Sequence, residues 1–237
     1  MKLVFLNSFA KDGNMCESIE PGVGKKNSEM FFSNNNILID ETVCLNIADK
    51  NIIKEYKTDI VQTKPYNIPN IEADALITKQ IKLFVYQKFA DCIPFTVFDK
   101  EQNILVFAHL GLQSVIQNLH IDIINKLIKE YNCKLENLVC YLGPSIKKDS
   151  YLKKIEDKKL IEIWQNYLEK QTDELYLIDM QGYVVDSLIK LNVSKENIEV
   201  SKVDTAKDEN YFSHHKSKND PNLPEQRFIY GVMMVED

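Results

Sequence analysis

The 237-residue chain contains little glycine or proline, seven of each, and this scarcity excludes collagen-like and low-complexity architectures. It also has no basic excess, because 35 acidic residues outnumber 29 basic ones and leave a net charge of -6. Such a protein lacks the positive surface that neutralises a phosphate backbone, so we expect no nucleic-acid partner. With 44% hydrophobic residues, the chain can still bury a substantial core.

Long apolar runs are absent too. No segment approaches the roughly 20 consecutive apolar residues of a membrane-spanning helix, and the apolar stretch at the N-terminus is too short for a signal peptide. The five cysteines form no disulfide framework by number or spacing, so we expect reduced thiols. These absences predict a cytoplasmic protein with no membrane partner, and we expect a monomer or a homodimer.

Arginine is nearly missing, since only Arg227 among the 29 basic residues is an arginine. A composition with this bias replaces arginine wherever lysine serves. A retained guanidinium then indicates a site that needs its planar fork, which binds phosphate or carboxylate through two parallel hydrogen bonds. The alternative is that one arginine persists by chance. Arg227 is therefore a candidate anion-binding residue.

Hydrophobic patterning predicts strands in the first half of the chain and alternating helices and strands in the second. Residues 7–36 are polar and are expected to be irregular. The expected strands are 37–39, 42–47, 58–62, 73–78, 81–86, 92–98, 104–108, 138–142, 198–203 and 228–235. The expected helices are 115–131, 158–170 and 179–191, followed by a loop over 204–224. We therefore predict an α+β fold in α/β layers, with residues 1–237 forming a single domain of mixed β-sheets packed with helices.

Cys92 and His109 are the first candidates for chemistry. Cys92 begins one apolar segment and His109 ends the next, so two neighbouring strands joined by a short turn can bring them into contact. A thiolate beside an imidazole either binds a metal such as Zn²⁺ or forms an activated nucleophile. The alternative is a buried cysteine that acts as a small hydrophobe near a hydrogen-bonded histidine.

The remaining histidines are weaker candidates. His214 and His215 are adjacent in the polar segment near the C-terminus, where histidines are usually solvated. They become catalytic candidates only if their loop covers Cys92 and His109. His120 starts an amphipathic helix and is expected on the surface.

Five short motifs occur in order along the chain and together resemble one family. They are Ala73-Asp74-Ala75-Leu76-Ile77-Thr78, Ala90-Asp91-Cys92-Ile93-Pro94, Ala108-His109-Leu110-Gly111, Leu142-Gly143-Pro144-Ser145-Ile146 and Tyr211-Phe212-Ser213. From about residue 31 to 234 the chain resembles the laccase-domain family. That family is known as multicopper polyphenol oxidase, as purine nucleoside phosphorylase and, in bacteria, as peptidoglycan editing factor.

The resemblance implies a fold, a cofactor and substrates. The fold is a laccase-like domain of mixed sheets layered with helices, of the cytotoxic-necrotizing-factor-like cysteine hydrolase type. The cofactor is Zn²⁺, with copper as the other reported metal, and Cys92 and His109 fall on two of its ligands. The substrates are phosphate and purine nucleosides of the adenosine and inosine type, and adenosine deamination is a second activity. Four histidines are too few for a true multicopper laccase.

Several family positions differ in this chain. Lys64 stands where the family has its first metal-binding histidine, and a protonated lysine cannot ligate a metal. His214 or His215 is a candidate replacement ligand and a candidate proton donor to the leaving purine. The family positions that suit substrate and phosphate are filled by Arg227, Lys216, Asn46 and Lys64.

Three functions are compatible with these residues. The first, which we expect, is a metal-dependent purine nucleoside phosphorylase that also deaminates adenosine. The second is a metal-free hydrolase of an amide or peptidoglycan-related substrate, with Cys92 as nucleophile, His109 as base and Lys64 lowering the pKa of the thiol. The third is a non-catalytic family member that serves as a binding or scaffold protein.

Overall fold

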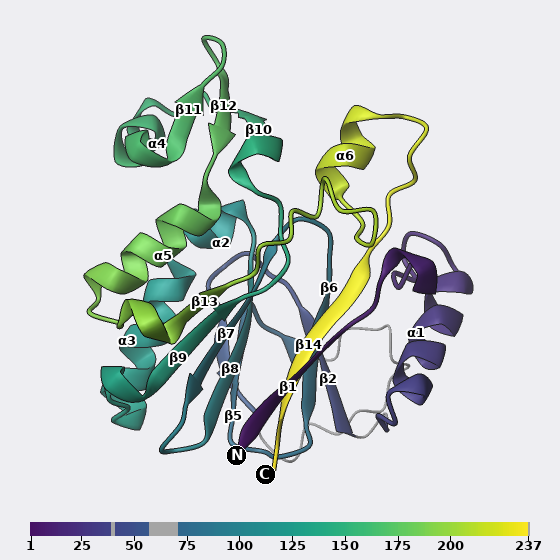
Figure 1. Ribbon diagram of the computed structural model, residues 1–237, viewed down its shortest axis with the longest axis vertical. Coiled ribbons are helices and arrows are strands. Elements are labelled where there is room, and N and C mark those ends of the chain that lie inside the picture. Colours follow the sequence, from purple (N-terminus) through teal and green to yellow (C-terminus); the bar gives the residue numbers. More distant parts are fainter. Residues whose placement is uncertain (39–40, 57–70, 237) are drawn as a thin grey trace.

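The computed structural model describes residues 1–38, 41–56 and 71–236, which form two β-sheets packed face to face between outer helices (Figure 1). The first sheet has five strands in the order β1-β14-β6-β2-β4. Their bounds are Lys2–Asn7 for β1, Phe228–Val235 for β14, Phe84–Phe89 for β6, Thr42–Asn46 for β2 and Ile71–Glu72 for β4. β1 pairs with β14 in antiparallel register, so segments from both ends of the sequence share this sheet.

The second sheet has six strands in the order β13-β9-β7-β8-β5-β3. Their bounds are Ile198–Val200 for β13, Leu138–Leu142 for β9, Ile93–Asp99 for β7, Ile104–Leu110 for β8, Ala75–Thr78 for β5 and Ile53–Glu55 for β3. All seven residues of β7 are buried, since other layers cover both faces of this central strand. A small third sheet has the order β10-β12-β11, with bounds Leu152–Lys154, Leu175–Ile178 and Leu168–Lys170.

Helices cover the outer face of each large sheet. The α-helices are α1 Val23–Asn34, α2 Leu112–Ile116, α3 Leu119–Tyr131, α4 Lys158–Ile163, α5 Met180–Lys190 and α6 His214–Asn219. The short 3₁₀ helices are η1 Ala10–Asp12, η3 Leu135–Asn137, η4 Lys148–Ser150, η5 Gln165–Tyr167 and η6 Lys195–Asn197. No helix in the described part of the chain is long and apolar enough to cross a bilayer.

Three apolar clusters hold these layers together. Between the sheets, buried side chains such as Phe107, Phe228 and Leu76 form the central core. On one side, α1 packs Phe32 against the aromatic rings on the outer face of the first sheet. On the other side, α3 turns its apolar positions, which recur every three or four residues, toward the second sheet. Hydrophobic burial at these three interfaces therefore fixes the strand ends that carry the candidate site.

The predicted mixed α+β architecture is confirmed, and the cytotoxic-necrotizing-factor-like type stays a prediction. The expected strand 58–62 lies outside the described residues, as does the last residue of the expected strand 37–39. Residues 37–38 form no strand.

The expectation of an irregular N-terminal segment is wrong, because α1 lies inside it. The hydrophobic periodicity of this segment is weak. The residue that caps the helix start is also not adjacent to the helix in the sequence. The Glu17 carboxylate accepts hydrogen bonds from the backbone N–H of Gly22 at 2.7 Å and of Lys25 at 2.8 Å, which satisfies donors at the helix start. The positive end of the helix dipole lies at this N-terminus, so it also stabilises the negative charge of the carboxylate.

Two further expectations fail near the C-terminal half. The helix expected over 158–170 ends at Ile163, because Trp164 turns inward and stacks on Tyr183 with ring centroids 4.2 Å apart. The chain then pairs as β11 with β12. The loop expected over 204–224 contains α6, whose first turn is capped by the Ser213 hydroxyl accepting from the backbone N–H of Lys216.

His120 is buried, contrary to its expected surface position. Neither of its ring nitrogens has a hydrogen-bond partner among the described residues, and its ring lies edge-on to Tyr183. Asn118, in the left-handed conformation with φ of 63°, separates α2 from α3 within the single helix expected over 115–131. That break turns the first turn of α3 inward.

Replacement of His120 tests this burial through the pH dependence of stability. Burial lowers the pKa of His120 to about 4, whereas an unfolded histidine titrates near 6.5, so the unfolded state binds more protons between these values. Stability must therefore fall as pH drops below about 6.5. Relative to pH 7.5, wild-type protein at pH 5 should lose about 2 kcal/mol more of its unfolding free energy than His120→Phe. Urea unfolding at both pH values measures this difference, and parallel losses would contradict it.

Candidate active site around Cys92 and His109

The β7–β8 pairing brings Cys92 and His109 together. In this antiparallel pair Pro94 lies opposite His109, and Cys92 immediately precedes β7 at the same end of the sheet. A Cβ atom added to Gly111 would lie 3.4 Å from Cys92 Sγ and 3.4 Å from His109 Cε1. The thiol and the imidazole therefore border one small space above the Gly111 α-carbon.

Both side chains are uncharged at neutral pH. Burial and the neighbouring Asp91 charge raise the pKa of the Cys92 thiol to about 12. Burial lowers the pKa of His109 to about 4, although the charge of Asp74 opposes this shift. Phe89 lies beside the imidazole with ring centroids 5.2 Å apart, and His109 Nδ1 is buried without a partner among the described residues. A thiol and a neutral imidazole have little nucleophilic or basic drive by themselves.

Asp91 ties a distant segment to this pair. It has an unusual positive φ of 86° and its carboxylate is buried. The carboxylate accepts hydrogen bonds from Thr205 Oγ1 at 2.8 Å, Ser213 Oγ at 2.9 Å and the backbone N–H of His215 at 2.6 Å. This three-bond clamp holds the segment 205–215 directly beside Cys92.

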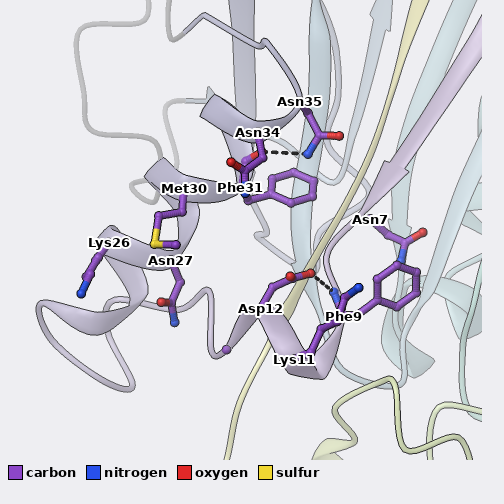
Figure 2. Close-up of a pocket in the computed structure, with 11 residues that line it drawn as sticks. Asn7, Phe9, Lys11, Asp12, Lys26, Asn27, Met30, Phe31, Asn34 and Asn35 are labelled. Atoms are coloured by element: carbon purple, nitrogen blue, oxygen red, sulfur yellow. Dashed lines mark hydrogen bonds between the residues drawn. The ribbon is translucent and has the colours of Figure 1, made fainter.

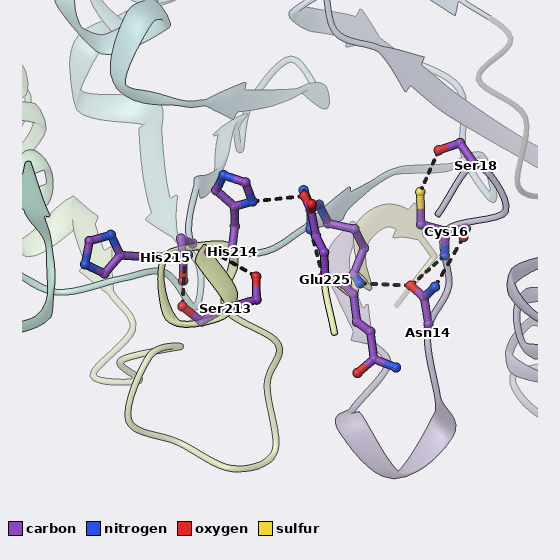
Figure 3. A network of polar contacts seen from close by, with 11 residues as sticks. Asn14, Cys16, Ser18, Ser213, His214, His215 and Glu225 are labelled. Atoms are coloured by element: carbon purple, nitrogen blue, oxygen red, sulfur yellow. Dashed lines mark hydrogen bonds and ion pairs between the residues drawn. The ribbon is translucent and has the colours of Figure 1, made fainter. Parts of the chain in front are cut away.

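The two histidines of that segment point to different partners (Figure 3). His214 Nδ1 lies 2.9 Å from Glu225 Oε1, while His215 Nε2 lies 3.1 Å from Asn219 Nδ2. The His215 ring also lies edge-on to Tyr151, and burial lowers its pKa. The segment lies next to Cys92, which was the condition for either histidine to be a catalytic candidate. Glu225 fixes the orientation of His214.

Arg227 places the chain's only guanidinium near the same pair. Its positive charge partly opposes the rise in the pKa of Cys92 that burial causes, and it adds to the fall in the pKa of His109 that burial causes. The guanidinium donates to Glu225 Oε1 at 2.5 Å, the oxygen that also contacts His214. This hydrogen bond is the main reason that the pKa of Glu225 lies below its usual value. Backbone contacts hold Arg227 as well, since its N–H donates to Asn14 Oδ1 at 3.0 Å.

The other predicted binding residues lie apart or outside the described residues. Lys216 is exposed on α6, at the edge of a separate hollow of about 230 Å³. Asn46 ends β2 and is exposed, while its carbonyl accepts from Ala73 at 3.0 Å. Lys64 lies outside the described residues. The roles of these three residues stay predictions.

Sequence reasoning missed several groups around the pair. Charges on Asp49 and Lys153 act on the Cys92 thiol, and Glu225 joins His214 to Arg227. Asp91 was visible next to Cys92 in its motif, but its clamp depends on residues more than a hundred positions away. No local pattern signals such a contact. The position of Asp49 also depends on a non-local contact, because the carboxylate of Asp74, 25 positions away, accepts its backbone N–H at 2.8 Å.

The side chains around Cys92 and His109 supply some of the donor atoms that the family's metal would need. Cys92 Sγ and the unpartnered His109 Nδ1 are two suitable ligand atoms facing one space. Across residues 1–38, 41–56 and 71–236, however, no three His, Cys, Asp or Glu side chains gather as a metal-binding group. Neither His214 nor His215 therefore completes a site there. The described donors fall one short of the three protein ligands of a catalytic zinc centre.

Comparisons with known proteins agree on one family. The sequence model of the family described as "Multi-copper polyphenol oxidoreductase laccase" matches residues 19–223. A purine nucleoside phosphorylase of Rickettsia prowazekii is 27% identical over 59% of this chain and 58% of its own length. One from Clostridium acetobutylicum is 25% identical over 54% of this chain and 57% of its own. The matches thus span less than two thirds of either relative.

Solved structures show the same fold at low identity. The Bacillus licheniformis hypothetical protein YfiH superposes with a TM-score of 0.82 at 15% identity, over 94% of this chain and 85% of that one. YlmD from Geobacillus stearothermophilus gives a TM-score of 0.84 at 14% identity, over 99% of this chain and 92% of its own. At this identity the likeness supports the fold alone.

Asp91→Asn tests the clamp. The amide has one acceptor oxygen, which can face Ser213 and the backbone N–H of His215, and its NH2 group then replaces the oxygen that accepts from Thr205 Oγ1. The charge-assisted hydrogen bonds of the clamp are lost, at a cost of about 1–3 kcal/mol. We expect a lower urea midpoint and faster hydrogen exchange over 205–215. Asp149→Asn is the matched control, because it makes the same charge change on an exposed side chain. Unchanged exchange over 205–215 in Asp91→Asn would show that the clamp does not hold the segment.

Proposed function

The chain belongs to the multi-copper polyphenol oxidoreductase laccase family, and we propose that it is a purine nucleoside phosphorylase. The names of its relatives support this activity. The observation that carries the proposal is the contact of the Arg227 guanidinium with Glu225 Oε1 at 2.5 Å, because the same oxygen lies 2.9 Å from His214 on the segment clamped beside Cys92. A guanidinium in this cluster provides the planar, positively charged group that a phosphate anion needs.

In the proposed reaction, Arg227 binds phosphate and directs one phosphate oxygen at C1′ of the nucleoside. A bond forms between that oxygen and C1′ while the bond from C1′ to purine N9 breaks, and its electron pair moves to the purine. His214 donates a proton to the leaving base, so the products are ribose 1-phosphate and a neutral purine. Phe89, which packs beside His109, limits the access of water there.

Glu225 has a positioning role in this proposal. One carboxylate oxygen contacts both His214 Nδ1 and Arg227, so it links the proton donor to the anion-binding group. With Nδ1 held by Glu225, the opposite ring nitrogen of His214 is left to transfer the proton.

Metal dependence and adenosine deamination complete the proposal. Cys92 and His109 would hold Zn²⁺, or copper, and a bound metal would supply Lewis-acid polarisation. Because the described residues provide only two of its ligands, no step above is routed through a metal. Deamination would replace the C6 amino group of adenosine with the oxygen of water and release ammonia.

The cysteine-hydrolase alternative has less support. An activated cysteine needs a thiolate or a base that is itself oriented by a third group. Here the pKa of the Cys92 thiol is raised and that of His109 is lowered. His109 Nδ1 has no orienting partner among the described residues. No specific contact favours the non-catalytic alternative.

Chromatography of inosine and adenosine incubated with the protein, phosphate and Zn²⁺ tests the activity. We expect hypoxanthine and ribose 1-phosphate from inosine only when phosphate is present, and little product from Cys92→Ala, which removes one wall of the site. Inosine formed from adenosine without phosphate would establish the deaminase instead. No turnover of either nucleoside would contradict the proposal.

Arg227→Lys separates charge from geometry at the anion site. The lysine keeps the charge but loses the planar fork, so the KM for phosphate should rise about ten-fold, with little change in the KM for inosine. Glu225→Gln should chiefly lower kcat, since it disturbs the orientation of His214. Lys218→Gln, on an exposed side chain of α6, is the control. Equal effects of Arg227→Lys on both KM values would argue against phosphate binding by this residue.

A further inference from the structure

A second cleft lies between α1 and the segment that contains η1 (Figure 2). Its volume is about 590 Å³, within the range of small-molecule sites. The residues that line it include none of the Cys92 site: neither the thiol, the imidazole nor Arg227 borders it. The proposed phosphorolysis leaves this cleft without a role.

One end of the cleft has a fixed width. Asn27 on α1 donates through Nδ2 to the backbone carbonyl of Asn14 at 2.9 Å. Gly13 has a positive φ of 80°, and a Cβ atom there would lie only 2.4 Å from Asn27 Nδ2. Glycine avoids the strain that a side chain meets at this positive φ, and it leaves room for the Asn27 amide. The cleft is therefore a built feature and not a gap between loosely packed elements.

The lining offers positive charge at its edge. Lys11 on η1 and Lys26 on α1 both border the cleft and are exposed. Within the described residues, neither ammonium group forms an ion pair with a carboxylate. The single acid in the lining, Asp12, already accepts the backbone N–H of Phe9 at 2.8 Å. Lys11 Nζ lies 5.8 Å from the centroid of the Phe9 ring. Two ammonium groups without a carboxylate partner among the described residues, in a chain with net charge -6, indicate an anionic ligand.

The rest of the lining combines amides with apolar surface. Asn34 and Asn35 line one side, and Asn35 uses its Nδ2 to donate to Phe31 while its Oδ1 is left to accept. Met30 is 53% exposed and borders the cleft, so its thioether is available for contact with a ligand. Across from α1, the Phe9 ring is held edge-on to Tyr211 with centroids 5.7 Å apart.

We propose that this cleft is a binding site for a nucleoside monophosphate. The two lysines would hold the phosphate as point charges. The asparagine amides supply the donors and acceptors that sugar hydroxyls and base edges require. Met30 and Phe9 present polarisable and aromatic surfaces against which a planar base packs.

The site also contacts the element that holds Arg227. Asn14, whose carbonyl anchors Asn27, accepts the backbone N–H of Arg227 through its side chain. The next residue, Met15, donates its backbone N–H to the Arg227 carbonyl at 2.9 Å. A ligand in the cleft therefore lies against a segment that is hydrogen-bonded to the proposed phosphate-binding residue.

Calorimetric titration with adenosine monophosphate tests this site independently of the proposed activity. Lys11→Gln together with Lys26→Gln should weaken binding about ten-fold or more. Lys25→Gln is the matched control, because it changes the same charge on the same helix while its side chain pairs with Glu29 and does not line the cleft. Met30→Ala should also weaken binding, through loss of the apolar wall. These exposed positions are not expected to affect folding.

Variants and competitors separate this site from the Cys92 site. Arg227→Lys should bind adenosine monophosphate as the wild type does, whereas weaker binding in Arg227→Lys together with unchanged binding in the double lysine variant would place the ligand at the Cys92 site and overturn the proposal. Inorganic phosphate that competes as well as the nucleotide would reduce the cleft to a plain anion site, which contradicts the proposed class. Equal affinity in wild type and the double lysine variant would also refute it.

Discussion

The carboxylate of Asp91 is the constraint on which the candidate site depends. It lies one residue before Cys92 and accepts hydrogen bonds from Thr205, Ser213 and the backbone of His215. A buried carboxylate is stable only when its oxygens are satisfied, so the segment that satisfies them must close over the strand end. The positive φ of Asp91 is maintained by the same contacts.

Charge in the site is concentrated away from the thiol and the imidazole. Cys92 and His109 are both neutral near pH 7, while Arg227 forms an ion pair with Glu225, whose carboxylate also contacts His214. In the proposed reaction, an incoming phosphate would meet a guanidinium that already donates to a carboxylate. Its binding would exchange partners at Arg227, and discrimination between anions would depend on how well each replaces Glu225.

The sequence predicted the features that local pattern encodes. The apolar runs before and after Asp99 became β7 and β8, and their short turn does bring Cys92 to His109. The failures have a common cause in distant contacts: the buried position of His120 and the clamp of Asp91 depend on side chains from other layers. Periodicity reports which face of one element is apolar, but it does not report what another element places against that face.

The long sequence separation of the contacts around the site has a consequence for the order of folding. The contacts that fix Arg227 join it to Asn14 across 213 positions, and the Asp91 bond to Ser213 spans 122. Closing such long loops is entropically costly before the contacts form, and proteins rich in non-local pairs fold slowly. The sheet core can assemble from neighbouring hairpins such as β7 and β8. The anion-binding geometry is thus expected to appear late in folding, after both ends of the chain have found each other.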